Sequence, residues 1–171
     1  MKSDARIDHI YLGIWPPFHA EPRQRIAATA FRQMHDSQEG HLTTVRGLGY
    51  TDGLLVQPFT TPSYQPSEAP YVEYMIDIQQ GDSELEIRTL PMLHVYEGRD
   101  ARYAVQLGDA EPQIFSIHAN DFTAEWRLNV LRGYSSRSLR IPPSAKGSQR
   151  LRIYLLDPGV VLQEVLVFGL Q

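Results

Sequence analysis

The sequence predicts an all-β protein, a jelly-roll-like β-sandwich of antiparallel strands with at most one or two short helices. About nine short segments have the composition of strands, with β-branched and aromatic residues and, in several, alternating apolar and polar side chains. Turn residues, mainly Gly, Pro and Asp, separate these segments. No βαβ rhythm recurs along the chain, which is typical of a sandwich rather than of a parallel sheet.

The first 24 residues have the character of a connector, and the β-sandwich domain is expected over residues 25–171. Apolar residues between Ile7 and Trp15 recur at helix-like spacing, and a proline pair ends the pattern. We expect the connector to dock on another surface and Trp15 to pack against the domain.

The N-terminal part of the domain is predicted to contain short strands and polar loops. These are a strand at 25–31, a polar loop at 33–41, strands at 42–46 and 54–58, and a Pro-rich loop up to residue 70. Gly47 and Gly49 lie in the connection between two of these strands. A glycine-rich phosphate-binding loop would need a helix after it, and none is predicted here. We therefore interpret the glycines as a turn between strands.

The middle of the chain alternates most clearly between apolar and polar residues. Over residues 71–78, the side chains of Val72, Tyr74, Ile76 and Ile78 share one face. Such a pattern predicts an antiparallel strand with one buried face and one face in water. Further strands of this kind are expected at 83–88, 102–107 and 114–118.

The C-terminal part is predicted to contain a short helix and the strands that close the core. Residues 124–133 favour a helix ended by Gly133, although their apolar residues also fit a strand. A strand at 136–141 and two apolar runs at 151–156 and 160–168 follow. The sequence Asp157-Pro158-Gly159 separates the two runs and predicts a turn, across which they pair or pack. We expect Asp157 to brace this turn through its own backbone.

Composition excludes several classes of function. The 171 residues contain 16 Lys and Arg against 20 Asp and Glu, a net charge of −4, which argues against a nucleic-acid or membrane partner. The chain has no cysteine, so disulfides and thiolate metal sites are excluded. No apolar run approaches the length of a membrane span, and the N-terminus lacks the apolar core of a signal peptide.

Motifs for catalysis or cofactor binding are not found, and we expect no catalytic residue, metal or cofactor in this chain. The six histidines form no i, i+4 pair and no H-x-H motif, although histidines distant in sequence can converge in a sandwich. Glu84 and Glu86 share one face of a predicted strand, as an acid/base pair would. Alternating carboxylates are more often the solvent-exposed face of a sheet, which is our interpretation. No G-x-S-x-G nucleophile motif occurs.

Aromatic and polar residues near the predicted helix form a candidate carbohydrate-binding site. The apolar faces of sugar rings stack on aromatic side chains, and sugar hydroxyls bond to amides and guanidinium groups. The candidate residues are Trp126, Asn129, Tyr134 and Arg137. Trp126 could instead fill the core of the sandwich, and the sequence leaves both interpretations open.

Several segments occur in the order found in a known family. They are 47–49, 69–74, 90–94, 101–105, 111–113, Trp126 with 129–132, and 157–163. Together they resemble the C-terminal β-sandwich module of glycoside hydrolase family 115, the xylan α-1,2-glucuronidases. Residues 157–163, Asp-Pro-Gly-Val-Val-Leu-Gln, are the most specific of these segments. His9, Ile10, Trp15 and Pro16 resemble the segment that leads into this module.

The resemblance implies a non-catalytic accessory domain of a xylan-degrading α-glucuronidase. Such a domain would pack on upstream catalytic domains of the same polypeptide, support a homodimer or position the polysaccharide, and would not cleave the substrate by itself. The alternative is an autonomous carbohydrate-binding module for xylan or a related plant polysaccharide. The polysaccharide substrate of the family implies an extracellular or periplasmic location.

Overall fold

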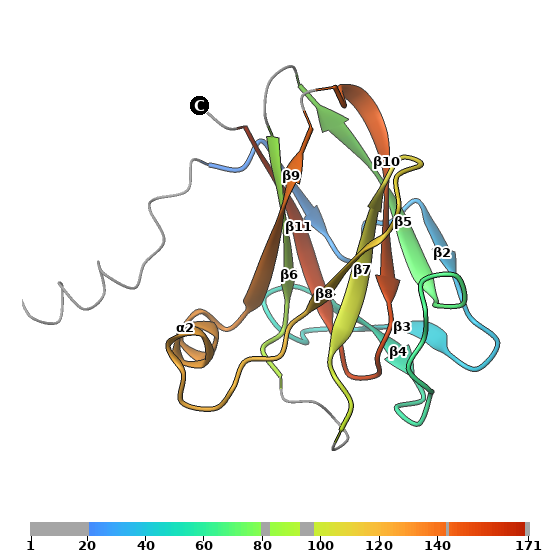
Figure 1. Ribbon diagram of the computed structural model, residues 1–171, viewed down its shortest axis with the longest axis vertical. Helices are drawn as coiled ribbons and strands as arrows, with labels where there is room; N and C mark the ends of the chain where they lie inside the picture. The colour runs from blue at the N-terminus through green and yellow to red at the C-terminus, as the bar shows by residue number, and fades with distance from the viewer. Residues whose placement is uncertain (1–20, 80–82, 93–97, 143, 170–171) are drawn as a thin grey trace, which may run out of the picture.

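The computed structural model confirms the β-sandwich: two antiparallel sheets pack face to face, and a short helix lies beside one end of them (Figure 1). The structure describes residues 21–79, 83–92, 98–142 and 144–169. Sheet A has the strand order β3 (His41–Val45), β4 (Gly53–Gln57), β11 (Leu162–Gly169), β6 (Ser83–Thr89) and β9 (Ser135–Ile141), with β1 (Gln24–Ala27) paired to β11. Sheet B has the order β2 (Gln33–His35), β5 (Tyr71–Ile78), β10 (Gly147–Leu155), β7 (Arg102–Leu107) and β8 (Gln113–Ser116).

The core lies between the sheets and follows the predicted alternation. On β5, Val72, Tyr74, Ile76 and Ile78 are buried against sheet A, and the residues between them face outward. The other strands contribute in the same way, for example Leu85 and Ile87 from β6. Tyr74 is the one of these with a polar group, and its hydroxyl donates to the backbone carbonyl of Ala28 (2.6 Å). The core can therefore bury a tyrosine without an unpaired hydroxyl.

The two central strands, β10 and β11, belong to different sheets, so the Asp157-Pro158-Gly159 turn carries the chain from one sheet to the other. The runs on either side of the turn therefore pack across the core and do not form a hairpin. Asp157 is buried, and its carboxylate accepts two hydrogen bonds from the Arg102 guanidinium (2.7 and 3.1 Å) and one from the Arg102 backbone N–H (2.9 Å). The expectation that Asp157 braces its own turn is wrong, because its carboxylate is paired with β7.

Helix α2 (Ala124–Arg132) confirms the predicted helix and its end. The side chain of Thr123 accepts from the backbone N–H of Trp126 (3.2 Å), which caps the first turn. Gly133 ends the helix in the left-handed conformation (φ 72°), where a Cβ would be strained. No helix among the described residues is long and apolar enough to cross a membrane.

Three segments differ from the expectation. The strand predicted at 25–31 ends at Ala27, because the chain turns there and Ala30 N–H donates back to the Ala27 carbonyl (2.9 Å). The predicted loop at 33–41 contains β2, a short polar strand whose pairing to β5 was not visible because it lacks apolar alternation. The connector prediction for residues 1–24 lies mostly outside the described residues.

Candidate functional site

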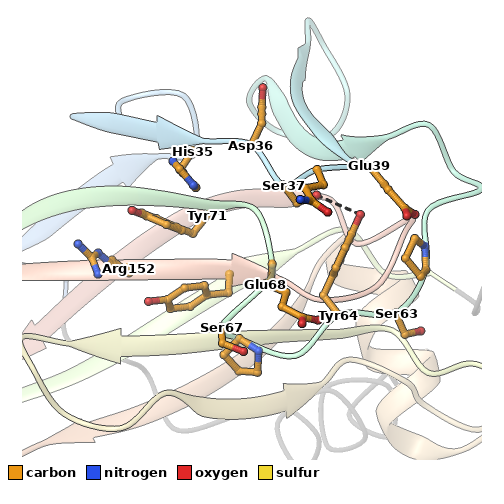
Figure 2. Close-up of a pocket in the computed structure, with 15 residues that line it drawn as sticks. His35, Asp36, Ser37, Glu39, Ser63, Tyr64, Ser67, Glu68, Tyr71 and Arg152 are labelled. Atoms are coloured by element: carbon orange, nitrogen blue, oxygen red, sulfur yellow. Dashed lines mark hydrogen bonds between the residues drawn. The ribbon is translucent and has the colours of Figure 1, made fainter.

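A pocket of about 750 Å³ lies on the outer face of sheet B, where three parts of the chain meet (Figure 2). The floor comes from β5 and β10, one wall from the end of β2 and the β2–β3 loop, and the other wall from the β4–β5 loop. We call this the Tyr71 pocket. Its lining residues are His35, Asp36, Ser37, Gln38, Glu39, Pro62, Ser63, Tyr64, Pro66, Ser67, Glu68, Ala69, Tyr71, Arg152 and Tyr154.

The floor of the pocket is aromatic. Tyr71 and Tyr154 are direct cross-strand partners of β5 and β10, and their ring centroids are 5.2 Å apart. Both point away from the core, since their neighbours Val72 and Ile153 point into it. His35, opposite Tyr71 on β2, stacks on its ring at 5.1 Å. The register of three strands therefore gathers the rings.

The β4–β5 loop is held over this face by apolar packing and hydrogen bonds. Tyr64 and Ala69 of the loop form a small second hydrophobic cluster with Ala104, Tyr154 and Leu156. The backbone N–H of Tyr64 donates to the Leu156 carbonyl (2.8 Å). These contacts make the loop wall a part of the fold with a defined position.

A hydrogen bond joins the two walls. Ser37 Oγ donates to the Tyr64 hydroxyl (3.0 Å), as the dashed line in Figure 2 shows. Gly40 permits this approach, since a Cβ there would lie 2.7 Å from Val56 Cγ1 and 3.0 Å from the Tyr64 hydroxyl. Asp36 braces the β2–β3 loop by accepting from the backbone N–H of Leu42 (2.8 Å).

An ion pair between β5 and β10 lies beside the aromatic floor. Arg152 Nε donates to Glu73 Oε2 (3.0 Å), and the two residues are cross-strand partners. The Arg152 guanidinium lies 4.9 Å from the centre of the Tyr71 ring. The hydrogen bond to Glu73 raises the pKa of Arg152 above its usual value. Glu73 is buried, and its negative charge is compensated by Arg152 and by Arg150, whose Nε lies 3.9 Å from Glu73 Oε2.

Two carboxylates of the walls are free to bind a ligand. Glu39 and Glu68 are exposed, and within the described part of the chain neither carboxylate makes a hydrogen bond or an ion pair. The Glu68 side chain lies beside Tyr64 in Figure 2, and Glu39 lies toward Ser63. Ionised carboxylates accept hydrogen bonds only, and serine hydroxyls both donate and accept. The pocket can therefore pair with a ligand rich in hydroxyl groups, over an aromatic floor.

Two of the sequence-predicted site residues, Trp126 and Asn129, lie together at α2. They line a smaller hollow of about 220 Å³ with Met92, Ile117 and Val130. Trp126 is partly buried there and is not among the side chains that form or pack on the core, so of the two interpretations that the sequence leaves open, core filling is wrong. The Asn129 amide donates to Ser135 Oγ (3.4 Å) and is buried. Trp126 thus offers a ring, while Asn129 is engaged within the protein.

The other two predicted site residues, Tyr134 and Arg137, are placed apart from this hollow. The Arg88 guanidinium lies 4.1 Å from the centre of the Tyr134 ring on the outer side of sheet A. Arg137 donates to the Ser116 carbonyl (2.8 Å) and pairs with Glu125 of α2 (2.7 Å). The Tyr134 ring and the Arg137 guanidinium therefore contact parts of the fold.

The Glu84 and Glu86 pair is also corrected by the structure. Glu86 is 4% exposed and pairs with Arg88 Nε at 2.6 Å, so it does not belong to a solvent-exposed face. Arg88 also pairs with Glu164 (2.9 Å), which binds Arg25 (2.6 Å). The Glu86 carboxylate is therefore part of a network of ion pairs on sheet A. No group of three potential metal ligands occurs in the part of the chain that the structure describes.

The Tyr71 pocket was missed from sequence. The sequence predicts a strand with one face in water over residues 71–78, but only loops for the β2–β3 and β4–β5 connections, which form the walls. The signal available was the cluster of prolines between residues 58 and 70, which marks a long and ordered connection. Long ordered loops are common at binding sites.

Comparison with solved structures finds the same sandwich fold in other proteins. A family GH115 4-O-methyl-α-glucuronidase with specificity for decorated arabinogalactans aligns with 92% of this chain at a TM-score of 0.63 and 24% identity. The chain spans 19% of the length of that enzyme. A carbohydrate-binding module of Cellvibrio mixtus lichenase 5A, in complex with cellotriose, aligns with 88% of the chain and 99% of its own length (TM-score 0.54, 12% identity).

A family 35 carbohydrate-binding module from Clostridium thermocellum also has this fold, covering 88% of the chain and all of the module (TM-score 0.52, 12% identity). At these identities the likeness concerns the fold alone. None of the curated proteins compared with the sequence matches it. The model of the glycosyl hydrolase family 115 C-terminal domain matches residues 25–169. That match covers most of the chain and confirms the resemblance. The chain therefore belongs to the family of C-terminal domains of glycosyl hydrolase family 115.

Proposed function

We propose that this chain is the non-catalytic accessory domain of an α-glucuronidase and that it binds the polysaccharide substrate in the Tyr71 pocket. The observation that carries the proposal is the pocket itself: an aromatic floor, Tyr71 and Tyr154, between walls that present free carboxylates and hydroxyls. Rings and acceptors of this kind match the apolar faces and hydroxyl groups of sugars. Membership of family 115 and the fold of carbohydrate-binding modules support the same role.

The polysaccharide we propose carries glucuronic acid and is xylan or a related plant polysaccharide. Decorated arabinogalactan is included, because the related enzyme is specific for it. Cleavage is assigned to catalytic domains of the same polypeptide, since the chain spans 19% of the related enzyme. Because such substrates lie outside the cell, the location we propose is extracellular or periplasmic. The alternative is an autonomous carbohydrate-binding module, which would bind the same polysaccharides without catalytic domains.

Affinity electrophoresis of the purified chain tests this function. Migration is compared in native gels with and without glucuronoxylan or arabinogalactan. We expect wild type to be retarded, and Tyr71→Ala to lose at least three quarters of the retardation, because the central ring of the floor is gone. Tyr50→Ala is the matched control, since Tyr50 is an exposed tyrosine that does not line the pocket. Equal migration of wild type with and without both polysaccharides would refute polysaccharide binding.

Trp126→Ala in the same gels tests the site predicted from sequence. If Trp126→Ala lost its retardation and Tyr71→Ala kept the wild-type retardation, the binding site would be the hollow at α2. We expect the opposite result. Circular dichroism spectra of all three variants confirm that each is folded before the gels are compared.

The apolar surface of α2 favours a second role, in packing against the catalytic domains. Phe122, Val130 and Leu131 are 73%, 53% and 66% exposed, and Phe122 packs on Trp126 with ring centroids 5.3 Å apart. Neighbouring apolar side chains at a surface are typical of a protein interface. The test is capture of separately expressed catalytic domains by the chain. Leu131→Glu should abolish capture, and sedimentation velocity distinguishes this role from a homodimer of the chain.

A further inference from the structure

The charges around the Tyr71 pocket identify the part of the polysaccharide that it can hold. Three carboxylates line the pocket, those of Asp36, Glu39 and Glu68, and Arg152 is the one arginine or lysine among the described lining residues. The Arg152 charge is compensated by Glu73 at 3.0 Å. A ligand in the pocket therefore meets an excess of negative charge.

Two of the three carboxylates, those of Glu39 and Glu68, contribute most to this charge at the ligand. Asp36 accepts from the Leu42 N–H, and in Figure 2 its carboxylate points away from Tyr71 and Tyr64. The carboxylates of Glu39 and Glu68 have no partner among the described residues, so their charge is available. Within the roughly 8 Å over which charges act at physiological salt, an anionic ligand group would be repelled. A hydroxyl donor would instead form charge-assisted hydrogen bonds.

From this arrangement we propose that the Tyr71 pocket binds a neutral, undecorated stretch of the polysaccharide and excludes its uronic-acid side groups. The inference rests on the proposed carbohydrate-binding function and adds its specificity. Glu39 and Glu68 bind sugar hydroxyls, and the same two residues reject a sugar carboxylate. In the whole enzyme, the domain then holds the chain beside a decoration and leaves the glucuronic acid free for the catalytic domains.

Isothermal titration calorimetry of the full chain with matched oligosaccharides tests the inference. The probes are xylotetraose against xylotriose carrying one 4-O-methylglucuronic acid, and β-1,6-galactotetraose against the galactotriose with the same decoration. We expect the neutral member of the better-binding pair to bind at least threefold more tightly at low salt, as repulsion from two exposed carboxylates would give. Raising the salt should narrow the difference.

A double variant links the preference to its cause. E39Q/E68Q keeps the size of both side chains and removes their charge, so the ratio of the two affinities should fall toward one. E21Q/E111Q is the control with the same change in net charge, because neither residue lines the pocket. It should keep the wild-type ratio.

The outcomes separate the two proposals. Equal or tighter binding of the decorated sugar by wild type would overturn the inference and leave the carbohydrate-binding function standing. An unchanged ratio in E39Q/E68Q would also overturn it, since the preference would have another cause. Absence of binding to all four sugars would refute the carbohydrate-binding function, and the inference with it.

Discussion

The Tyr71 pocket, which β2 borders, and the surface of α2 differ in how they are built, and Figure 1 shows α2 and β2 on opposite sides of the sandwich. The pocket has polar walls that are joined by a hydrogen bond, and an ion pair joins the two strands of its floor. The α2 surface presents apolar side chains, Phe122, Val130 and Leu131, that are largely exposed. A polar, preorganised pocket suits a hydrated ligand such as a sugar, whereas an exposed apolar surface suits another protein.

The comparison predicts that changes in the pocket framework cost stability and changes at α2 do not. The largest effect is expected for Glu73→Ala, which leaves Arg152 without its carboxylate partner on the face of sheet B. We expect a loss of about 2 kcal/mol, below the value for fully buried pairs because Arg152 is partly exposed. Urea unfolding measures it, with Glu111→Ala as the exposed control. A loss below 0.5 kcal/mol, the size of an ordinary surface change, would show that the ion pair does not support the floor.

An intermediate effect is expected where the two walls meet. Tyr64→Phe removes the hydroxyl that accepts from Ser37 and keeps the ring in its apolar cluster. The expected loss is about 1 kcal/mol, the contribution of one hydrogen bond, in the same unfolding assay. Ser37→Ala should cost more, because Ser37 Oγ also accepts from the Gly40 N–H (2.9 Å). The double variant should still cost clearly less than the sum of the two, because both single changes break the bond between Ser37 and Tyr64. Additive losses would indicate that the hydroxyls act separately.

The smallest effect is expected at α2. Leu131→Glu replaces an exposed apolar side chain, so the free energy of unfolding should change by no more than about 0.5 kcal/mol. Retardation by polysaccharide should also stay at the wild-type value. A loss of 2 kcal/mol or more would show that the α2 surface is part of the fold, and the contrast between the two regions would fail.

The fold was predictable because its strands carry a local signal. The alternation over residues 71–78 fixed both the strand and its buried face, and Gly133 marked the end of the helix. The short strand β2 was missed because Gln33, Met34 and His35 lie at a sheet edge, where alternation is weak. Pairing to β5 gives this strand its place, and pairing depends on residues distant in sequence.

The candidate site was less predictable than the fold, because its residues converge only in three dimensions. His35, Glu68, Tyr71 and Arg152 are separated by up to 117 positions and meet through the order β2–β5–β10 in sheet B. The sequence directed attention to Trp126, since tryptophan is a common sugar platform. It did not reveal that Asn129, Tyr134 and Arg137 have partners within the protein. Asp157 likewise resembled a turn residue, while its partner, Arg102, lies 55 positions earlier.

The central claim is that a sugar binds on the outer face of sheet B at Tyr71. Titration of isotope-labelled protein with xylotetraose and with β-1,6-galactotetraose, followed by amide chemical shifts, tests it most directly. We predict that the largest shifts for at least one sugar fall on His35, Glu39, Tyr64, Glu68 and Tyr71, with those of α2 unchanged. Shifts confined to Trp126 and its neighbours, or no shifts with either sugar, would contradict the claim.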